Sequence, residues 1–356
     1  MGSDSHGSFF GERHPSGSKG RPRRARVLAA GVAVVVAVLT CSGAWANAAT
    51  PTGVSRSAET GVGTLDLTHV STEAVAPTAT IPTGLPYISM MAVAGGRLWA
   101  SSPDGMVSID PATNQVTRVS DEAAWDVTGA GSRVVRDAGA RGVVEMWDAE
   151  GGRLEWSVDS DTPAGSAIVG DEVWVADHNA GTLSIRRATD GQLVDRVMIG
   201  PRGYAGPQMP ALLSGSVWAT DYRIHQVVGV DVATRQIVAR VQVPHSVLFC
   251  QKRSEPVGDA VWISDCSSLV TRVDTKGLRA ATVDVGSEPG TPLGVDGECW
   301  IPIDGRLVHV TNDLRADRAV AITGQSLALE GVVAFGSAWV NVGDGTIVRL
   351  PAPEDW

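Results

Sequence analysis

The sequence predicts an all-β protein, a seven-bladed β-propeller with four antiparallel strands in each blade. Three observations support this fold: a tryptophan that recurs at a nearly regular interval, short alternating strands between turn residues, and matching strand patterns at the two ends of the chain. Repeats of about 40 residues built only from short strands are typical of propellers. No segment shows a convincing helical period, so we expect strands throughout.

The recurring tryptophan marks the second strand of each repeat. Its positions are Trp99, Trp174, Trp218, Trp262, Trp300 and Trp339. Each follows a glycine-containing turn, as in Gly215–Trp218. The first interval is 75 residues and the others are 38 to 44, so one unit is missing from the tryptophan series. Gly131–Val135 supplies that unit, with Val135 in place of the tryptophan, which makes seven units.

Each repeat also contains three other strands. In the fourth repeat an apolar stretch, Ala211–Leu213, precedes the glycine turn, and an alternating strand, Val227–Val230, follows the tryptophan. The turn Asp231–Arg235 then leads into Ile237–Val243. Period-2 alternation bounded by Gly, Asp and Pro indicates strands that are buried on at least one face.

The ends of the chain indicate how the ring closes. After Leu350 only six residues remain, so the seventh repeat lacks its outermost strand. The segment Thr78–Gly84 resembles such a strand and stands before the first complete repeat. Pairing the two would close the sheet and remove an exposed edge. We therefore expect the propeller to span residues 73–356, about 41 residues for each blade.

The first 46 residues have the pattern of an export signal. Four arginines between Arg21 and Arg26 precede an apolar run, Val27–Thr40, and Ala44–Ala46 matches a small-x-small cleavage site. Residues 47–72, rich in Ala, Thr, Ser and Gly, are expected to be a flexible linker. We expect a secreted protein. The alternative is a lipoprotein on the outer side of the cytoplasmic membrane, anchored at Cys41, which follows the apolar run.

Charge and hydropathy exclude several classes of partner. Residues 1–46 hold six of the 29 Lys and Arg and two of the 39 Asp and Glu, which leaves 23 basic and 37 acidic residues. An acidic surface without basic runs excludes nucleic acid as a partner. No later apolar run is long enough to span a membrane, and we expect a monomer.

The cysteines after the leader are odd in number, which is notable in an exported protein. Cys250 and Cys266 flank a predicted hairpin, so we expect a disulfide between them and a free thiol at Cys299. That bridge would stabilise the fold by roughly 3 kcal/mol. The alternative is that all three cysteines are small buried apolar residues.

The repeats resemble those of a family of exported propellers. Val173–Asp177, Thr182–Ile185 and Thr189–Val194 are similar to the YVTN or YncE-like repeats of bacterial exported seven-bladed propellers. The fold is also similar to that of the streptogramin-lyase propellers, which catalyse an elimination with loop histidines. The resemblance covers essentially the whole chain after the leader. It implies the fold and leaves function open, because the repeat residues are scaffold.

Most repeat residues have a structural interpretation. The tryptophans are expected to stack one blade on the next. Asp177, Asp221 and Asp265 each follow a repeat tryptophan by three residues, where a short carboxylate can accept backbone N–H bonds and start a turn. A calcium site built from these loops is the alternative, and we expect no metal.

One sector of loops collects the residues suited to acid-base or binding chemistry. The candidate catalytic residues are His178, His225 and His245, and the candidate binding residues are Arg202, Tyr204, Tyr222 and Arg223. We expect them in loops on one face of the propeller, beside the central channel. A neutral imidazole could abstract a proton while an arginine stabilises the developing anion. The alternative is a polar loop surface without catalytic function.

The sequence leaves three functions open. The first is a secreted module that binds a ligand or protein, or acts as a scaffold, through one loop face. The second is a lyase or hydrolase that uses the loop histidines. The third is a purely structural envelope protein. Motifs for phosphate loops, paired-cysteine zinc sites, zinc proteases, serine-nucleophile elbows and haem attachment are missing, and the sequence identifies neither a cofactor nor a specific ligand.

Overall fold

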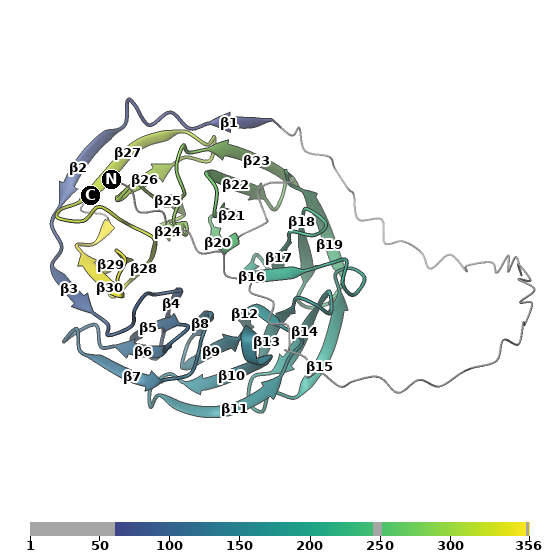
Figure 1. Ribbon diagram of the computed structural model, residues 1–356. Coiled ribbons are helices and arrows are strands. Elements are labelled where there is room, and N and C mark those ends of the chain that lie inside the picture. Colours follow the sequence, from purple (N-terminus) through teal and green to yellow (C-terminus); the bar gives the residue numbers. More distant parts are fainter. Residues whose placement is uncertain (1–60, 245–250, 354–355) are drawn as a thin grey trace, which may run out of the picture. The chain divides into compact units, whose positions relative to one another are not determined.

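The computed structural model describes residues 61–244, 251–353 and 356, all within the unit Pro51–Trp356. These residues form seven sheets, the blades, arranged around a central channel (Figure 1). The predicted seven-bladed propeller with four antiparallel strands in each blade is confirmed. Within the described residues, no helix is long and apolar enough to cross a membrane.

Four blades are built from consecutive strands, with the first strand at the channel and the fourth at the rim (Figure 1). Blade 1 consists of β4 (Met90–Ala94), β5 (Arg97–Ser102), β6 (Gly105–Ile109) and β7 (Val116–Ser120). Blade 2 consists of β8 (Asp126–Ala130), β9 (Arg133–Ala138), β10 (Val143–Asp148) and β11 (Arg153–Asp159), with a 3-10 turn at Gly139–Arg141. Blade 3 consists of β12 (Pro163–Val169), β13 (Glu172–Asp177), β14 (Thr182–Arg187) and β15 (Leu193–Met198). Blade 4 consists of β16 (Pro207–Leu213), β17 (Ser216–Asp221), β18 (Gln226–Asp231) and β19 (Ile237–Gln242).

The other three blades each include a strand from the N-terminal segment. Blade 5 consists of β20 (Gln251–Val257), β21 (Ala260–Asp265), β22 (Leu269–Asp274), β23 (Arg279–Asp284) and, at its rim, β1 (Val62–Thr64). Blade 6 consists of β24 (Leu293–Val295), β25 (Glu298–Ile303), β26 (Arg306–Val310), β27 (Ala316–Ile322) and β2 (Ser71–Val75). Blade 7 consists of β28 (Glu330–Ala334), β29 (Ser337–Asn341), β30 (Thr346–Leu350) and β3 (Ala79–Pro82).

Strand β3 closes the ring as the sequence predicts. It pairs antiparallel with β30, with Ala79 opposite Arg349 and Pro82 opposite Thr346. The hydroxyl of Thr83 donates a further hydrogen bond of 2.6 Å to the Gly345 carbonyl. Blade 7 thus joins a strand from the N-terminal segment to the last strand of the chain, and its β30 edge is covered.

The first two strands correct the expectation of a linker up to Thr72. β1 pairs parallel with β23, and β2 pairs parallel with β27, so residues in 61–72 add outer strands to blades 5 and 6. Leu65 and Val75 anchor these strands through buried apolar side chains. The other side chains of β1 and β2 are exposed, which explains why the sequence pattern did not predict strands here. The rest of the expected linker and the predicted signal peptide lie outside the described residues.

Seven apolar clusters hold the ring together, one at each interface between neighbouring blades. The repeat tryptophan of every blade except blade 2 is buried at the interface with the following blade. At ring closure, Trp339 of blade 7 packs with Met91 and Leu98 of blade 1. A buried aromatic ring removes 150 to 250 Å² from water, so these side chains dominate the packing between blades.

Blade 2 replaces the missing tryptophan with one from another strand. Val135 occupies the repeat position in β9 and is buried, as expected. Trp156 in β11 joins the same interface with blade 3, and its indole N–H donates a 2.8 Å hydrogen bond to the Ala188 carbonyl. Each of the seven interfaces therefore contains at least one buried tryptophan.

Two of the three cysteines in the prediction, Cys266 and Cys299, are among the described residues. Cys299 is a free, buried thiol in the interface of blades 5 and 6. Cys266 directly follows β21, whereas Cys250 lies outside the described residues. The disulfide between Cys250 and Cys266 stays a prediction.

The role of β3 can be tested with two truncated chains, one that begins at Pro77 and one that begins at Gly84. The first keeps β3 and lacks β1 and β2, whereas the second lacks all three. We expect the Gly84 chain to be less stable than the Pro77 chain by about 2 kcal/mol or more, because buried Ile81 is lost and β30 becomes an edge. Thermal and urea unfolding measure the difference, and equal stability of the two chains would contradict the closure by β3.

Candidate functional site

The sequence-predicted site lies on one face of the ring. Because the strands of a blade alternate in direction, the connections between blades and the turns between second and third strands emerge on the same side, which we call the loop face. The described parts of the connections between blades are residues 83–89, 121–125, 160–162, 199–206, 243–244, 285–292 and 323–329. Turns between first and second strands emerge on the opposite side, which we call the turn face.

Two of the predicted residues, His178 and Tyr222, form a stacked pair between blades 3 and 4. His178 follows β13 and Tyr222 follows β17, so both lie in turns of the loop face. Their ring centroids are 5.3 Å apart at an interplanar angle of 14°, and 3.3 Å separates His178 Nε2 from the Tyr222 hydroxyl oxygen. His178 and Tyr222 occupy the same position in adjacent repeats, four residues after the repeat tryptophan. Their imidazole and phenol rings are therefore in contact between the two blades.

Arg223 completes this cluster. Its guanidinium carbon lies 5.6 Å from the centre of the Tyr222 ring, and its Nε donates a 3.2 Å hydrogen bond to the Tyr222 hydroxyl. The same guanidinium donates to the Ala205 carbonyl at 3.2 Å and to the Asn179 side-chain oxygen at 3.4 Å. These bonds hold the arginine between the turn that carries His178 and the connection that precedes blade 4.

Gly206 is required for the close approach of these side chains. A Cβ atom at this position would lie 2.7 Å from His178 Cε1 and 3.1 Å from Arg223 Cδ. Its backbone N–H donates a 2.8 Å hydrogen bond to the carboxylate of Asp221, which is fully buried. The cluster therefore packs directly against the backbone at the start of blade 4.

Two of the three strand-end aspartates, Asp221 and Asp265, accept backbone N–H bonds in turns as expected. Asp221 also accepts hydrogen bonds from the backbone N–H groups of Arg223 and Ile224, at 3.0 and 3.3 Å. Asp265 accepts a 2.9 Å bond from the Ser267 N–H. Asp177 instead accepts bonds from the hydroxyls of Ser160 and Thr182. Burial raises the pKa of Asp221, and the backbone bonds oppose that rise.

The remaining predicted residues are less closely associated with the cluster. His225 lies three residues after Tyr222 with a left-handed backbone, φ 54°, and its carbonyl accepts a bond from the Val243 N–H. Arg202 is exposed and forms a 2.8 Å ion pair with Asp161, and Tyr204 is exposed in the same connection. His245 lies outside the described residues. The structure thus joins His178, Tyr222 and Arg223, and no position can be assigned to the third histidine.

The sequence analysis missed a set of exposed apolar side chains on the loop face. Leu327, Tyr87 and Trp125 lie in the connections before blades 7, 1 and 2, which are consecutive in the ring. Their exposed fractions are 50%, 44% and 51%. The available signal was a large apolar residue in each connection, but other apolar residues lie in the same connections, such as Leu85 and Ile88 beside Tyr87, and these are buried. We call Leu327, Tyr87 and Trp125 the apolar arc.

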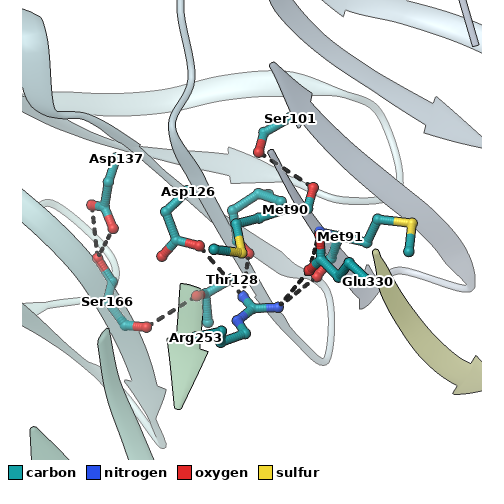
Figure 2. Close-up of polar contacts among 10 residues, drawn as sticks. Met90, Met91, Ser101, Asp126, Thr128, Asp137, Ser166, Arg253 and Glu330 are labelled. Carbon is teal, nitrogen blue, oxygen red and sulfur yellow. Dashed lines mark hydrogen bonds and ion pairs between the residues drawn. The ribbon is translucent and has the colours of Figure 1, made fainter. Parts of the chain in front are cut away.

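A second cluster that the sequence analysis missed lies in the central channel, where Arg253 spans from blade 5 to the opposite wall (Figure 2). Its guanidinium donates 2.7 Å hydrogen bonds to the carbonyls of Met91 in blade 1 and Val127 in blade 2. The same group lies 3.5 Å from Asp126 Oδ1 and 3.6 Å from Glu330 Oε1. One cation therefore connects four blades. The signal in the sequence that could have revealed this cluster is a charged residue, Arg253, in the first strand of its repeat, which lines the channel.

Glu330, Arg253 and the neighbouring Asp137 have shifted pKa values. Burial raises the pKa of Glu330 to about 8, although Arg253 and the bond from the Met91 N–H oppose the rise. Burial alone would lower the pKa of Arg253, but Asp126 and Glu330 raise it. Next to this group, burial and the charge of Asp126 raise the pKa of Asp137, whose carboxylate accepts 2.7 Å bonds from Ser166 (Figure 2).

Neither cluster has the composition of a metal site. Among residues 61–244, 251–353 and 356, no group of three or more His, Cys, Asp and Glu side chains could hold a metal ion. The loop-face cluster can instead bind an anionic or hydrogen-bonding group through Arg223, with His178 as a proton acceptor.

The protonation of His178 provides a test of the cluster. Burial and then the charge of Arg223 lower the pKa of His178, so we expect a value below the ordinary 6.5 or so. Because the unfolded chain then binds the proton more readily, this histidine makes the fold less stable as pH falls below that ordinary value. NMR titration of the imidazole should give a lowered pKa that rises in Arg223→Gln.

Arg202→Gln is the matched control, because it removes an exposed arginine that pairs with Asp161. We expect the pKa of His178 to be unchanged in this variant. A wild-type pKa at or above the ordinary value, or equal values in the Arg223 and Arg202 variants, would show that Arg223 does not control the imidazole.

Comparisons with known proteins identify the fold. No family model matches the chain, and no curated protein matches its sequence. Among solved structures it is similar to BamB from Moraxella catarrhalis (TM-score 0.53, 14% identity, 74% of this chain and 85% of that one). It is also similar to virginiamycin B lyase from Staphylococcus aureus (0.60, 14%, 77% and 98%) and to a chain in a mitotic checkpoint complex (0.65, 8%, 84% and 98%). The structural similarity shows that the chain shares its fold with these proteins, and at such low identities it shows the fold alone.

Proposed function

We propose that this protein is an exported binding or scaffold module that uses its loop face to hold a protein partner. The apolar arc of Leu327, Tyr87 and Trp125 is the observation that carries the proposal. Large apolar side chains are exposed on three consecutive connections, and a partner that docks on this face would remove them from contact with water. Tryptophan and tyrosine are also enriched among the residues that dominate binding energy in protein interfaces.

The distribution of other exposed apolar residues supports this choice of face. Leu154, Leu193, Val194 and Val238 lie on the fourth strands of their blades, at the rim, where single exposed aliphatic residues are ordinary. Phe335 lies in a turn between first and second strands, on the turn face. The two exposed aromatic residues of the apolar arc and the exposed Tyr204 all belong to the loop face.

Rigidity of the scaffold also favours binding. The connections that carry the apolar arc are attached to strands that pair within their blades, and these blades pack through tryptophan interfaces. A surface that is ordered before association loses less conformational entropy when it binds. The fold is compatible with such a role, since one structural neighbour is a chain in a mitotic checkpoint complex.

The cellular setting is part of the proposal. We propose removal of residues 1–46 as a signal peptide and secretion of a monomer, with lipid attachment at Cys41 as the alternative. The repeat pattern supports membership of the YVTN or YncE-like exported propellers.

A second function, that of a lyase, is supported by the His178, Tyr222 and Arg223 cluster. A lowered pKa keeps His178 neutral near pH 7, where its imidazole can accept a proton from a substrate. Arg223 is close enough to stabilise an anion that develops beside it. One structural neighbour is named a lyase, virginiamycin B lyase. Loss of turnover in His178→Ala, with binding at the apolar arc unchanged, would favour this function.

Site-specific photocrosslinking in the producing cells tests the binding proposal. Trp125→benzoylphenylalanine places a crosslinker in the apolar arc, and Phe335→benzoylphenylalanine places it on the turn face at a similar exposed fraction, 40%. We expect a discrete larger product from position 125. Tyr87→Ala and Leu327→Ala should reduce its yield by about 10-fold, which corresponds to about 1.4 kcal/mol of binding.

The controls separate loss of binding from loss of folding. Exposed side chains such as Tyr87 and Leu327 contribute little to stability, so their alanine variants should unfold within about 0.5 kcal/mol of the wild type. Equal product yields from positions 125 and 335, or a yield that does not change in the alanine variants, would overturn the assignment of the apolar arc as the binding surface.

A further inference from the structure

The central channel contains a cavity that the loop-face proposal does not use. Its volume is about 290 Å³, enough for a small organic molecule, and its walls come from the first strands of six blades. Representative lining residues are Met91, Thr128, Ile168, Met209, Glu255 and Val332. Most of these side chains are apolar, which is typical of ligand cavities with a few polar groups that orient the ligand.

Arg253 places one end of this cavity near the loop face. Arg253 and Asp126 lie near the starts of their channel strands, whereas Ile168 and Leu212 lie near the ends of theirs. First strands begin at the loop face and end at the turn face, so the cavity extends from the Arg253 group toward the turn face. A ligand in it would be separate from a partner bound at the apolar arc.

Glu255 distinguishes this cavity from an ordinary apolar channel. Arg253 and Glu255 of β20 both line the cavity, and Glu255 Oε1 also lies near blade 6, 3.9 Å from where a Cβ atom at Gly294 would be. The Arg253 guanidinium is already occupied by two carbonyls, Asp126 and Glu330. In the part of the chain that the structure describes, no residue forms a hydrogen bond with the Glu255 carboxyl.

The balance of charge makes the cavity suited to a cation. Arg253 faces two carboxyl groups, Asp126 and Glu330, so its single positive charge is compensated before Glu255 is considered. Glu255 then adds a negative charge in a largely apolar space, where the interaction between charges is stronger than in water. An anion would meet this carboxylate without a free guanidinium to bind it.

We propose that the channel cavity binds a small organic cation, whose ammonium group pairs with Glu255 and whose apolar body lies against Met91, Ile168 and Val332. This site is independent of the proposed loop-face function. The Glu255 carboxylate, which forms no hydrogen bond to a described residue, would neutralise the ammonium group. The apolar walls would bury the apolar body of the ligand. An ammonium ion paired with a carboxylate forms a strong, charge-assisted hydrogen bond in such surroundings.

Protonation of Glu255 predicts how binding depends on pH. Burial raises the pKa of Glu255 to about 7, and the nearby charge of Arg253 opposes the rise. The charged groups that share the channel with it are Arg253, Asp126 and Glu330. A cation binds the ionised carboxylate, so affinity should fall as pH decreases from 8 to 6.

Benzylammonium is a suitable probe, with benzyl alcohol and benzoate as neutral and anionic analogues of similar shape. We expect calorimetric titration of the wild-type protein at pH 8 to show benzylammonium binding at millimolar concentration or below, roughly the limit for so small a ligand. Benzyl alcohol and benzoate should bind at least about 10-fold more weakly. Binding of benzylammonium should weaken by a similar factor at pH 6.

Glu255→Gln preserves the shape of the side chain and removes its charge. We expect this variant to bind benzylammonium at least about 10-fold more weakly and to depend less on pH than the wild type. Some dependence should persist, because the pKa of Glu330 is raised to about 8 and this carboxyl still titrates in the same range. Glu155→Gln is the matched control, because Glu155 is an exposed carboxylate on the rim strand β11, and it should bind like the wild type. Thermal unfolding of both variants confirms that they are folded.

Three results would overturn the proposal. The first is no binding of benzylammonium to the wild-type protein at roughly 10 mM, and the second is equal binding of benzoate. The third is unchanged benzylammonium affinity in a folded Glu255→Gln variant. None of these results bears on crosslinking at Trp125, so this site and the loop-face function fail or succeed separately.

Discussion

The structure depends above all on the pairing of β3 with β30, which closes the ring. Without it, blade 7 would consist of three strands and would leave the β30 edge open. Closure also lets Trp339 pack against blade 1, so the seventh interface is as apolar as the other six. The tryptophan interfaces, the channel and the loop face all rely on a ring that begins and ends in the same sheet.

Closure brings charged groups together that are far apart in the sequence. Arg253 reaches carbonyls more than 120 residues earlier in the chain, and it also faces Glu330 of blade 7. These groups can be buried because hydrogen bonds and opposite charges compensate their loss of water. These contacts occupy the channel near the loop face. The cavity lined by Glu255 extends from them toward the turn face. The fold provides two separate surfaces, an apolar arc outside and a cavity inside, whose apolar walls carry the Glu255 carboxyl.

Periodic features of the sequence predicted the fold well. The tryptophan interval and the strand pattern of Thr78–Gly84 are local signals, and both led to the observed blades and their closure. β1 and β2 were missed because their side chains are mostly exposed and their parallel partners are more than 200 residues away. The role of Trp156 was not predicted, because it lies in the fourth strand of its blade, whereas the repeat tryptophans lie in second strands.

The candidate sites were less predictable, because they depend on contacts between residues of different blades. His178 and Tyr222 were assigned to one sector from loop positions, but their stacking depends on the spacing between two blades. Arg253 and Glu255 occur once, and a periodic pattern carries no information about a residue that differs from its repeat equivalents. Which side chains meet across the channel follows from the geometry of the closed ring.

Hydrogen exchange of the full chain tests that closure most directly. We expect the hydrogen-bonded amides of β3 and β30 to exchange as slowly as those between β28 and β29, because both pairs open only when the ring unfolds. If the β3 and β30 amides exchange orders of magnitude faster than the rest of blade 7, the ring opens without unfolding, and closure by β3 is not the constraint that holds it.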